Sequence, residues 1–180
     1  MDMTDIEAIK QLKARYCRFL DAKDWIAWRD LFTEDFLSDT SDSGGLRIQG
    51  VDEFIDFVRS NLGRPQQATV HMVHAPEIEL TSPGAARGVW MLEDYVKFAA
   101  GLNLRGYGHY HETYEKRDGR WRIKTSKLTR LREDLVTPFF SIHVTGWLRR
   151  QSLKAGQRHA AAWTAKRGTA SATVTPGKDR

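Results

Sequence analysis

The chain has 180 residues, a formal charge of +5 and a sequence pI near 9.4. Its length favours a single domain whose core needs no covalent staples. Apolar residues make up 41% and aromatic residues 11% of the sequence, which excludes a chain that is disordered throughout. Cys17 is the only cysteine, so an intrachain disulfide framework and a cysteine-rich zinc site are also excluded.

The positive charge is confined to the C-terminal end. Six of the 28 basic residues but only one of the 23 acidic residues fall in 151–180, which leaves 22 of each sign in 1–150. We therefore predict a globular domain over 1–150 and a basic, disordered tail over 151–180. A basic arm that contacts nucleic acid is the alternative. The tail lacks the pattern of aromatic residues interleaved with arginine that would support it, and we expect no nucleic-acid partner.

The N-terminus indicates a protein that is neither exported nor embedded in a membrane. Its residues MDMTDIEAIKQLKARY are acidic and then amphipathic, unlike the apolar stretch of a secretory signal. No apolar run approaches the roughly 18–20 residues that a membrane span needs. We therefore expect a cytoplasmic protein without a membrane partner.

The first third of the chain has the three- and four-residue apolar spacing of amphipathic helices. A helix is predicted over 5–22, a short second helix over 25–32 with Asp24 as its N-cap, and a third helix over 51–62. Between the second and third helices, Gly44 and Gly45 suit the turn of a hairpin of two short strands.

From Ala68 onward the apolar pattern changes to that of strands. Strands are predicted over 68–80, 85–99, 103–117 and 120–134, and residues 139–148 form either a last strand or an interface segment. Short turns force antiparallel pairing, and strands this long curve strongly and contain bulges. The fold class is therefore α+β. We expect a cone of curved antiparallel sheet, in which the N-terminal helices enclose a pocket for a small apolar molecule.

Asp21 and two histidines are the first candidates for chemistry. Asp21 falls in the last turn of the first helix, where the helix dipole disfavours an anion, so this carboxylate is either kept for function or simply solvated. His71 and His74 lie on opposite faces of their strand, because they are three residues apart. His71, in the body of the strand, is the better candidate for a base in the pocket. A buried histidine that only satisfies a hydrogen bond is the alternative.

The following strands offer two further groups of polar residues. His109 and His111 share a strand face, but this spacing alone is a weak signal and we expect no metal ion. On an inward face, Arg130 would bind a carboxylate or stabilise an enolate oxygen. A structural cross-strand pair between Arg130 and Glu93 or Asp94 is the alternative.

Motifs of several large enzyme classes are absent from the sequence. It contains no nucleophile elbow, P-loop, dinucleotide-binding glycine motif or H-E-x-x-H zinc motif. What remains is acid–base chemistry by His, Asp and Tyr in an apolar cavity. Tyr110 and Glu112, on one face of their strand, and Trp90 on the preceding strand are expected to contact the substrate.

Four stretches of the sequence carry a family resemblance: DIEAIKQLKARYCRFLDAKDW, VHMVHAPEIEL, WMLED and YEKRDGRW. Over about residues 4–147 the chain resembles the SnoaL-like branch of the NTF2-like superfamily, and within it the bacterial bile acid 7α-dehydratases. The resemblance implies an NTF2-like cone and catalytic roles for Tyr16, Asp21, His71 and Arg130. Scytalone dehydratase has a second catalytic histidine on the next strand, whereas the matching LEDYV here has none.

The function that this resemblance implies is a cofactor-independent lyase that dehydrates a hydrophobic polycyclic, steroid-like carbonyl substrate. His71, oriented by Asp21, would take a proton next to a carbonyl and return it to the departing hydroxyl, while Tyr16 and Arg130 stabilise negative charge. An isomerase, cyclase or dehydrochlorinase on the same scaffold is one alternative, and a non-catalytic binding module is another. Large apolar residues near the chain end predict a homo-oligomer, by resemblance a trimer and otherwise a dimer: Phe139, Phe140, Ile142 and Trp147.

Overall fold

The structure is a computed structural model that describes residues 3–43, 45–144, 162 and 165. Gly44, Trp147 and nearly all of the predicted tail over 151–180 lie outside the described residues. Among the residues that it describes, no helix has both the length and the apolar character needed to cross a membrane.

Three α-helices precede the long strands, as predicted. They are α1 (Met3–Ala22), α2 (Trp25–Arg29) and α3 (Val51–Leu62). The α1 helix buries one apolar face, and its buried side chains include Ile9, Leu12, Tyr16 and Leu20. The second helix is shorter than the predicted 25–32, because the carbonyl of Leu31 already accepts a hydrogen bond from Ile123 of a strand. Pairing with the sheet therefore takes over where the apolar helix pattern would have continued.

A tight turn joins α1 to α2. The Lys23 N–H donates to the Leu20 carbonyl and the Asp24 N–H donates to the Phe19 carbonyl, which is the Schellman pattern of a helix end. Lys23 sits at the left-handed position of this turn with φ 61°, a place that glycine usually takes. The Asp24 side chain accepts from the Ala27 N–H at 3.1 Å, which confirms it as the N-cap of α2.

Seven strands form one curved sheet. They are β1 (Phe32–Asp39), β2 (Arg47–Gln49), β3 (Thr69–Ser82), β4 (Ala85–Ala99), β5 (Leu102–Arg117), β6 (Arg120–Val136) and β7 (Ser141–His143), and a 3-10 turn, η1 (Ser41–Ser43), lies between β1 and β2. The order is β2-β1-β6-β5-β4-β3, and β7 pairs with β6. All neighbours are antiparallel except β1 and β6, which are parallel. The predicted hairpin, meander and α+β class are confirmed.

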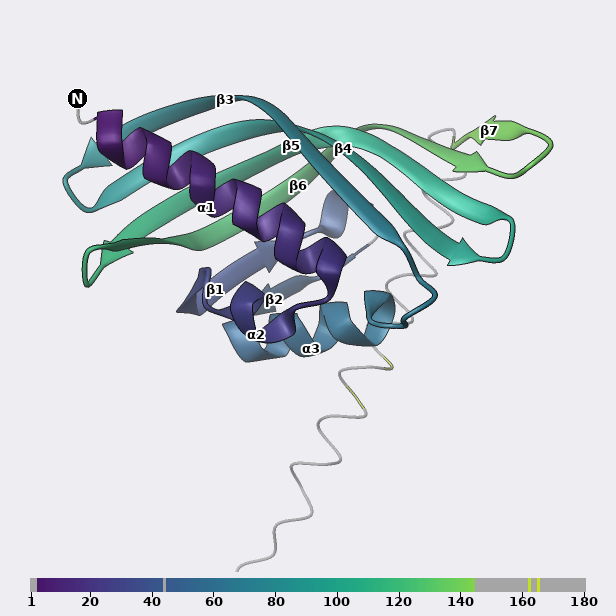
Figure 1. The fold of residues 1–180 in the computed structure, drawn as a ribbon, viewed down its shortest axis with the longest axis horizontal. Helices are drawn as coiled ribbons and strands as arrows, with labels where there is room; N and C mark the ends of the chain where they lie inside the picture. Colours follow the sequence, from purple (N-terminus) through teal and green to yellow (C-terminus); the bar gives the residue numbers. More distant parts are fainter. Residues whose placement is uncertain (1–2, 44, 145–161, 163–164, 166–180) are drawn as a thin grey trace, which may run out of the picture.

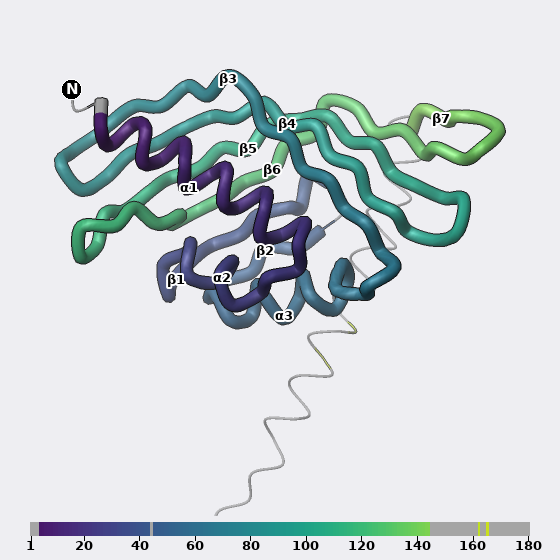
Figure 2. Tube along the Cα trace, in the orientation of Figure 1, coloured from purple at the N-terminus to yellow at the C-terminus, as the bar shows by residue number. Residues whose placement is uncertain are grey.

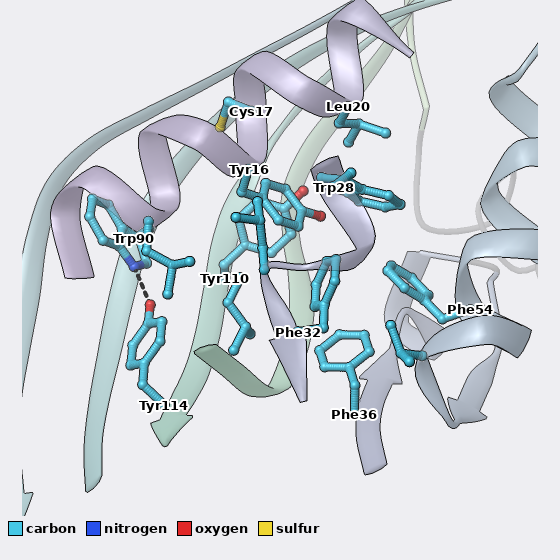
Figure 3. Close-up of a cluster of buried hydrophobic side chains, with 14 of the residues drawn as sticks. Tyr16, Cys17, Leu20, Trp28, Phe32, Phe36, Phe54, Trp90, Tyr110 and Tyr114 are labelled. Atoms are coloured by element: carbon cyan, nitrogen blue, oxygen red, sulfur yellow. Dashed lines mark hydrogen bonds between the residues drawn. The ribbon is translucent and has the colours of Figure 1, made fainter. Parts of the chain in front are cut away.

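The helices lie against one face of this sheet and close a cone. The α1 helix runs across β3 to β6, while α2, α3, β1 and β2 lie together at its C-terminal end (Figure 1). The same trace shows β6 and β7 reaching away from this body as an arm (Figure 2). Four aromatic residues at the base, Trp28, Phe32, Phe36 and Phe54, pack with ring centroids 4.5–5.5 Å apart (Figure 3). These four rings form part of the buried hydrophobic core.

Candidate active site

The cone holds an internal cavity of about 160 Å³. Residues of α1, α3 and the long strands line it, and they include Tyr16, Leu20, Phe54, Val58, Leu62, His71, Asp94, Tyr110, Ser126, Leu128 and Arg130. Wider grooves of about 720 and 800 Å³ on the described surface contain neither His71 nor Asp21. Three of the four predicted catalytic residues therefore meet in one small cavity, and the fourth, Asp21, lies directly behind His71.

Asp21 and His71 form a hydrogen-bonded pair across α1 and β3. The Nδ1 atom of His71 lies 2.7 Å from Oδ1 of Asp21, and the backbone N–H of His71 donates to Oδ2 at 2.8 Å. A carboxylate can only accept, so Nδ1 carries the proton and Nε2 is left as the basic nitrogen. Since the His71 side chain lines the cavity and is 6% exposed, the structure supplies an oriented base inside an apolar pocket.

Two neighbours hold the Asp21 carboxylate in place. Thr69 donates to Oδ1 of Asp21 at 2.9 Å, and the Lys23 ammonium donates to the Thr69 hydroxyl at 2.7 Å. Burial lowers the pKa of Lys23, and the nearby Asp21 charge opposes this effect. The unfavourable place of Asp21 at the end of α1 is thus offset by four groups that face it or support it. This arrangement differs from the solvated helix-end aspartate that was the alternative.

The strand β3 separates the two histidines as the alternation predicts. His71 and Thr69 point toward α1, while His74 is exposed on the other face. The register of β3 against β4 shifts between His74 and Glu77, and Ala75 has φ 36°, the mark of a bulge. Because the bulge follows His74, it does not bring this histidine into the cavity.

Tyr16 and Tyr110 place two phenol groups in the cavity. Their rings lie side by side beneath α1, with centroids 5.9 Å apart (Figure 3). Burial raises the pKa of Tyr16, and the hydrogen bond to Tyr110 and the Glu112 charge add to the increase. Burial likewise raises the pKa of Tyr110, and Asp94 adds to it. Both hydroxyl groups therefore stay protonated at neutral pH and can donate to an oxygen that gains negative charge.

Arg130 and Asp94 form a buried ion pair at the same cavity. Nη2 of Arg130 lies 2.7 Å from Oδ2 of Asp94, and the two side chains are 7% and 3% exposed. Although burial opposes the charge, the Asp94 carboxylate raises the pKa of Arg130. Among the described residues, Nε and Nη1 of Arg130 and Oδ1 of Asp94 have no hydrogen-bond partner, although Nε lies 3.6 Å from Oε1 of Glu133. The ion pair therefore keeps donor and acceptor atoms that a ligand oxygen and a ligand hydroxyl would satisfy.

Sequence reasoning considered Asp94 only as a structural partner, yet it lines the cavity beside Arg130. The strand register explains why Asp94 lies near the candidate base, because Asp94 pairs directly with His71 across β3 and β4. A carboxylate opposite a candidate base is a signal that strand alignment could have revealed. Gly106 leaves the necessary room, since a side chain there would overlap Oδ1 of Asp94 and Nη1 of Arg130.

Trp90 and Glu112, predicted to contact substrate, do not line this cavity. The Trp90 indole donates to the Tyr114 hydroxyl at 2.7 Å (Figure 3). That hydroxyl donates to Oε2 of Glu112 at 2.6 Å. Glu112 also accepts from Lys13 at 2.6 Å. The face was predicted correctly, but alternation does not give the depth along a strand, and this end of the cone is filled by protein groups. Only Tyr110 of the three predicted binding residues reaches the cavity.

The histidine pair of β5 lies away from the cavity. His109 and His111 have ring centroids 6.2 Å apart, and His111 pairs with Thr129. In the part of the chain that the structure describes, no group of three or more His, Cys, Asp or Glu side chains is arranged to hold a metal ion.

Residues 1–127 match the sequence profile of the SnoaL-like domain. The chain belongs to the SnoaL-like family. A Gibberella zeae protein named Probable cyclase FGR4 is 23% identical over 135 residues, which are 68% of this chain and 89% of that protein.

Solved structures of other proteins share the fold. A candidate scytalone dehydratase from Novosphingobium aromaticivorans has a TM-score of 0.67 at 20% identity, over 73% of this chain and 87% of that one. Hexachlorocyclohexane dehydrochlorinase LinA-type3 from Novosphingobium barchaimii has a TM-score of 0.64 at 16% identity, over 80% and 92%. These likenesses show that the chain has the NTF2-like cone fold.

Proposed function

We propose that this SnoaL-like protein is a cofactor-independent lyase that dehydrates a hydrophobic carbonyl compound. The observation that carries the proposal is the His71 imidazole, held at Nδ1 by Asp21 at 2.7 Å and lining the same cavity as the unpartnered Nη1 of Arg130. A base and a buried cationic donor in one apolar pocket suit proton removal next to a carbonyl, since the carbonyl oxygen becomes negative as the proton leaves.

The proposed reaction is an elimination through an enolate. Nε2 of His71 takes a proton from the carbon next to the carbonyl, and the electrons of that C–H bond move to the carbonyl oxygen. Arg130 and the two protonated tyrosines donate to this oxygen. The bond from the β-carbon to the hydroxyl oxygen then breaks, a C=C bond forms, and the proton on Nε2 leaves with the hydroxyl as water. His71 returns to its neutral form, so no external oxidant or reductant is needed.

This scheme has a stereochemical consequence. Within the described lining of the cavity, His71 is the only histidine, so one imidazole removes the proton and protonates the leaving group. Both must then depart from the same face of the substrate. A substrate stereospecifically labelled with deuterium would lose the label that lies on the face of the hydroxyl.

Cavity volume narrows the class of substrate. About 160 Å³ is close to the roughly 150 Å³ of an engineered cavity that holds benzene, and below the roughly 300 Å³ at which pockets for larger ligands begin. We propose that a single ring, bearing the carbonyl and the hydroxyl, occupies the catalytic part of the cavity. A steroid-like substrate would place its other rings outside this part of the cavity, and α3 would have to move to make room for them.

A panel of β-hydroxy ketones and their vinylogues tests the proposal. We would compare a one-ring 3-hydroxycyclohexanone with 3-oxo-4-ene steroids that carry a 7-hydroxyl, free and as coenzyme A thioesters. In the steroids a C=C bond lies between the carbonyl and the reacting carbons, so His71 would take the γ-proton and form a dienolate. The ultraviolet absorption of the conjugated product follows both reactions. His71→Gln should lower turnover by about 10²- to 10⁴-fold, while Lys10→Met, on the exposed side of α1, should not change it. Conversion without release of water would replace the dehydratase with an isomerase. Turnover that His71→Gln leaves intact would refute the proposed base.

We also propose that the protein assembles as a homotrimer through the β6–β7 arm. Phe139 is 91% exposed, and Phe140 and Ile142 beside it are also exposed, which favours burial against another subunit. Light scattering should give about three times the 20.6 kDa chain mass, and Phe139→Asp should lower it. If the unaltered protein has the mass of one chain, this assembly is excluded. If it has the mass of two chains, the assembly is a dimer and not a trimer.

A further inference from the structure

A second ion pair is completely buried against the two tyrosine rings. Lys13 of α1 and Glu112 of β5 are joined at 2.6 Å, and both side chains are 0% exposed. Neither group lines the cavity. Charges are rarely buried this completely, because removal from water is costly even for a pair. The position therefore needs an explanation beyond stability.

The Lys13 ammonium lies against the faces of both phenol rings that reach the cavity. Its Nζ atom is 3.7 Å from the Tyr110 ring centroid and 4.0 Å from that of Tyr16. Lys13 precedes Tyr16 by three residues and so shares its helix face, while Tyr110 and Glu112 alternate onto one strand face. A single cation thus contacts both donors that the proposed reaction uses.

Glu112 holds that cation and is itself held. It accepts from Ser126 at 3.0 Å and from the Tyr114 hydroxyl at 2.6 Å, in addition to Lys13. These contacts hold the carboxylate in place, and the carboxylate in turn holds the ammonium at the two rings.

We propose that Lys13 is a positioning residue that strengthens the Tyr16 and Tyr110 hydroxyls as donors to a developing oxyanion, and that the Glu112 charge opposes ionisation of the Tyr16 hydroxyl. A cation on a phenol face attracts the electron density that builds up on the ring when its hydroxyl donates strongly. The Glu112 charge has the opposite effect, since it raises the pKa of Tyr16. The inference rests on the proposed function for its purpose.

Binding of 4-nitrophenol tests the inference without any turnover. Its neutral and ionised forms absorb at different wavelengths, so the affinity of the cavity for each form can be measured across pH. The decisive quantity is the ratio of the affinity for the phenolate to the affinity for the phenol. Because this ratio does not depend on catalysis, it can support the role of Lys13 even where the dehydratase proposal fails.

Two variants should move this ratio in opposite directions. Lys13→Met with Glu112→Gln removes both charges and keeps the side-chain volumes, and it should lower the ratio about tenfold. Glu112→Gln alone keeps an acceptor for Lys13 and should raise the ratio. Lys10→Met, one turn earlier on the exposed side of the helix, is the matched control and should leave the ratio unchanged.

The result that overturns the inference is equally specific. If the neutral pair binds both forms of nitrophenol as the unaltered protein does, Lys13 only fills space. If both variants lower the ratio together, the pair acts by holding the rings in place and not by its charge. If the double variant does not fold, the test rests on Glu112→Gln alone: a higher affinity ratio supports the inference, and an unchanged or lower ratio overturns it.

Discussion

Replacement of Asp21 by asparagine is the sharpest test of the catalytic pair. The carboxylate accepts three hydrogen bonds, from Nδ1 of His71 at 2.7 Å, from the His71 backbone at 2.8 Å and from Thr69 at 2.9 Å. An asparagine has one acceptor oxygen and an NH₂ group that must face one of these donors. The His71 ring then loses its fixed tautomer or turns away from the cavity.

The size of the effect follows from these contacts. Hydrogen bonds to a charged group contribute about 1.5–3 kcal/mol each, but Asp21 is 23% exposed and its removal also relieves an unfavourable helix-end charge. We therefore expect a stability loss of about 1–2 kcal/mol. Loss of an oriented base should lower kcat/KM by about 10²- to 10⁴-fold. Activity would thus be reduced far more than folding.

A double-mutant cycle separates this explanation from a general disturbance. His71→Gln alone should cost about as much activity as Asp21→Asn, and the two changes together should cost no more than His71→Gln alone, because Asp21 acts through His71. Asp24→Asn is the matched control, since asparagine also caps a helix well. Kinetics on the β-hydroxy ketone panel and urea unfolding give both quantities. Losses that multiply in the double variant would show that the two residues act independently and would refute the pair.

Three further outcomes follow from the structure. Burial raises the pKa of the Cys17 thiol from 9.0 to about 11. The stability that the protonated thiol contributes is therefore complete below pH 9 and is lost as the pH rises to 11. Between these pH values, the free energy of unfolding of Cys17→Ala, measured with urea, should fall by about 3 kcal/mol less than that of the unaltered protein. Gly106→Ala should displace the Arg130 guanidinium, lower kcat/KM at least tenfold and destabilise by about 1–3 kcal/mol. Lys23→Gly and Lys23→Ala both lose the hydrogen bond to Thr69. In urea unfolding, the glycine variant should nevertheless be more stable than the alanine variant by about 1 kcal/mol, because glycine adopts the left-handed backbone conformation without strain.

The element order and the positions of Asp21 and His71 could be predicted because they depend on local patterns. A three-residue spacing places His71 and His74 on opposite faces whatever the sheet does, and Asp21 stands out because a helix end is the wrong place for an anion. Both observations need only the secondary structure around each residue. The structure then supplies what local patterns lack, namely the distance of 2.7 Å between them.

Other parts of the site depend on how distant segments align. Asp94 lines the cavity because it pairs with His71 across β3 and β4. Trp90 and Glu112 do not line it, because they lie nearer the filled end of the cone. The burial of Lys13 was not predicted, since a lysine beside an apolar helix stripe normally keeps its ammonium group in water. A lysine on the same face as Ile9, Tyr16 and Leu20 is nevertheless a signal in the sequence that could have marked it as buried.

The proposed reacting groups and part of the cavity wall come from different segments of the chain. The charged groups and tyrosines of the lining belong to α1, β3, β4, β5 and β6, whereas Phe54, Val58 and Leu62 of α3 supply only apolar surface. Changes in α3 can therefore reshape the space for a substrate and leave the proposed proton-transfer groups as they are. In such a scaffold, new substrates are reached by altering one short helix, and relatives that share the same acid–base pair should differ most in that helix.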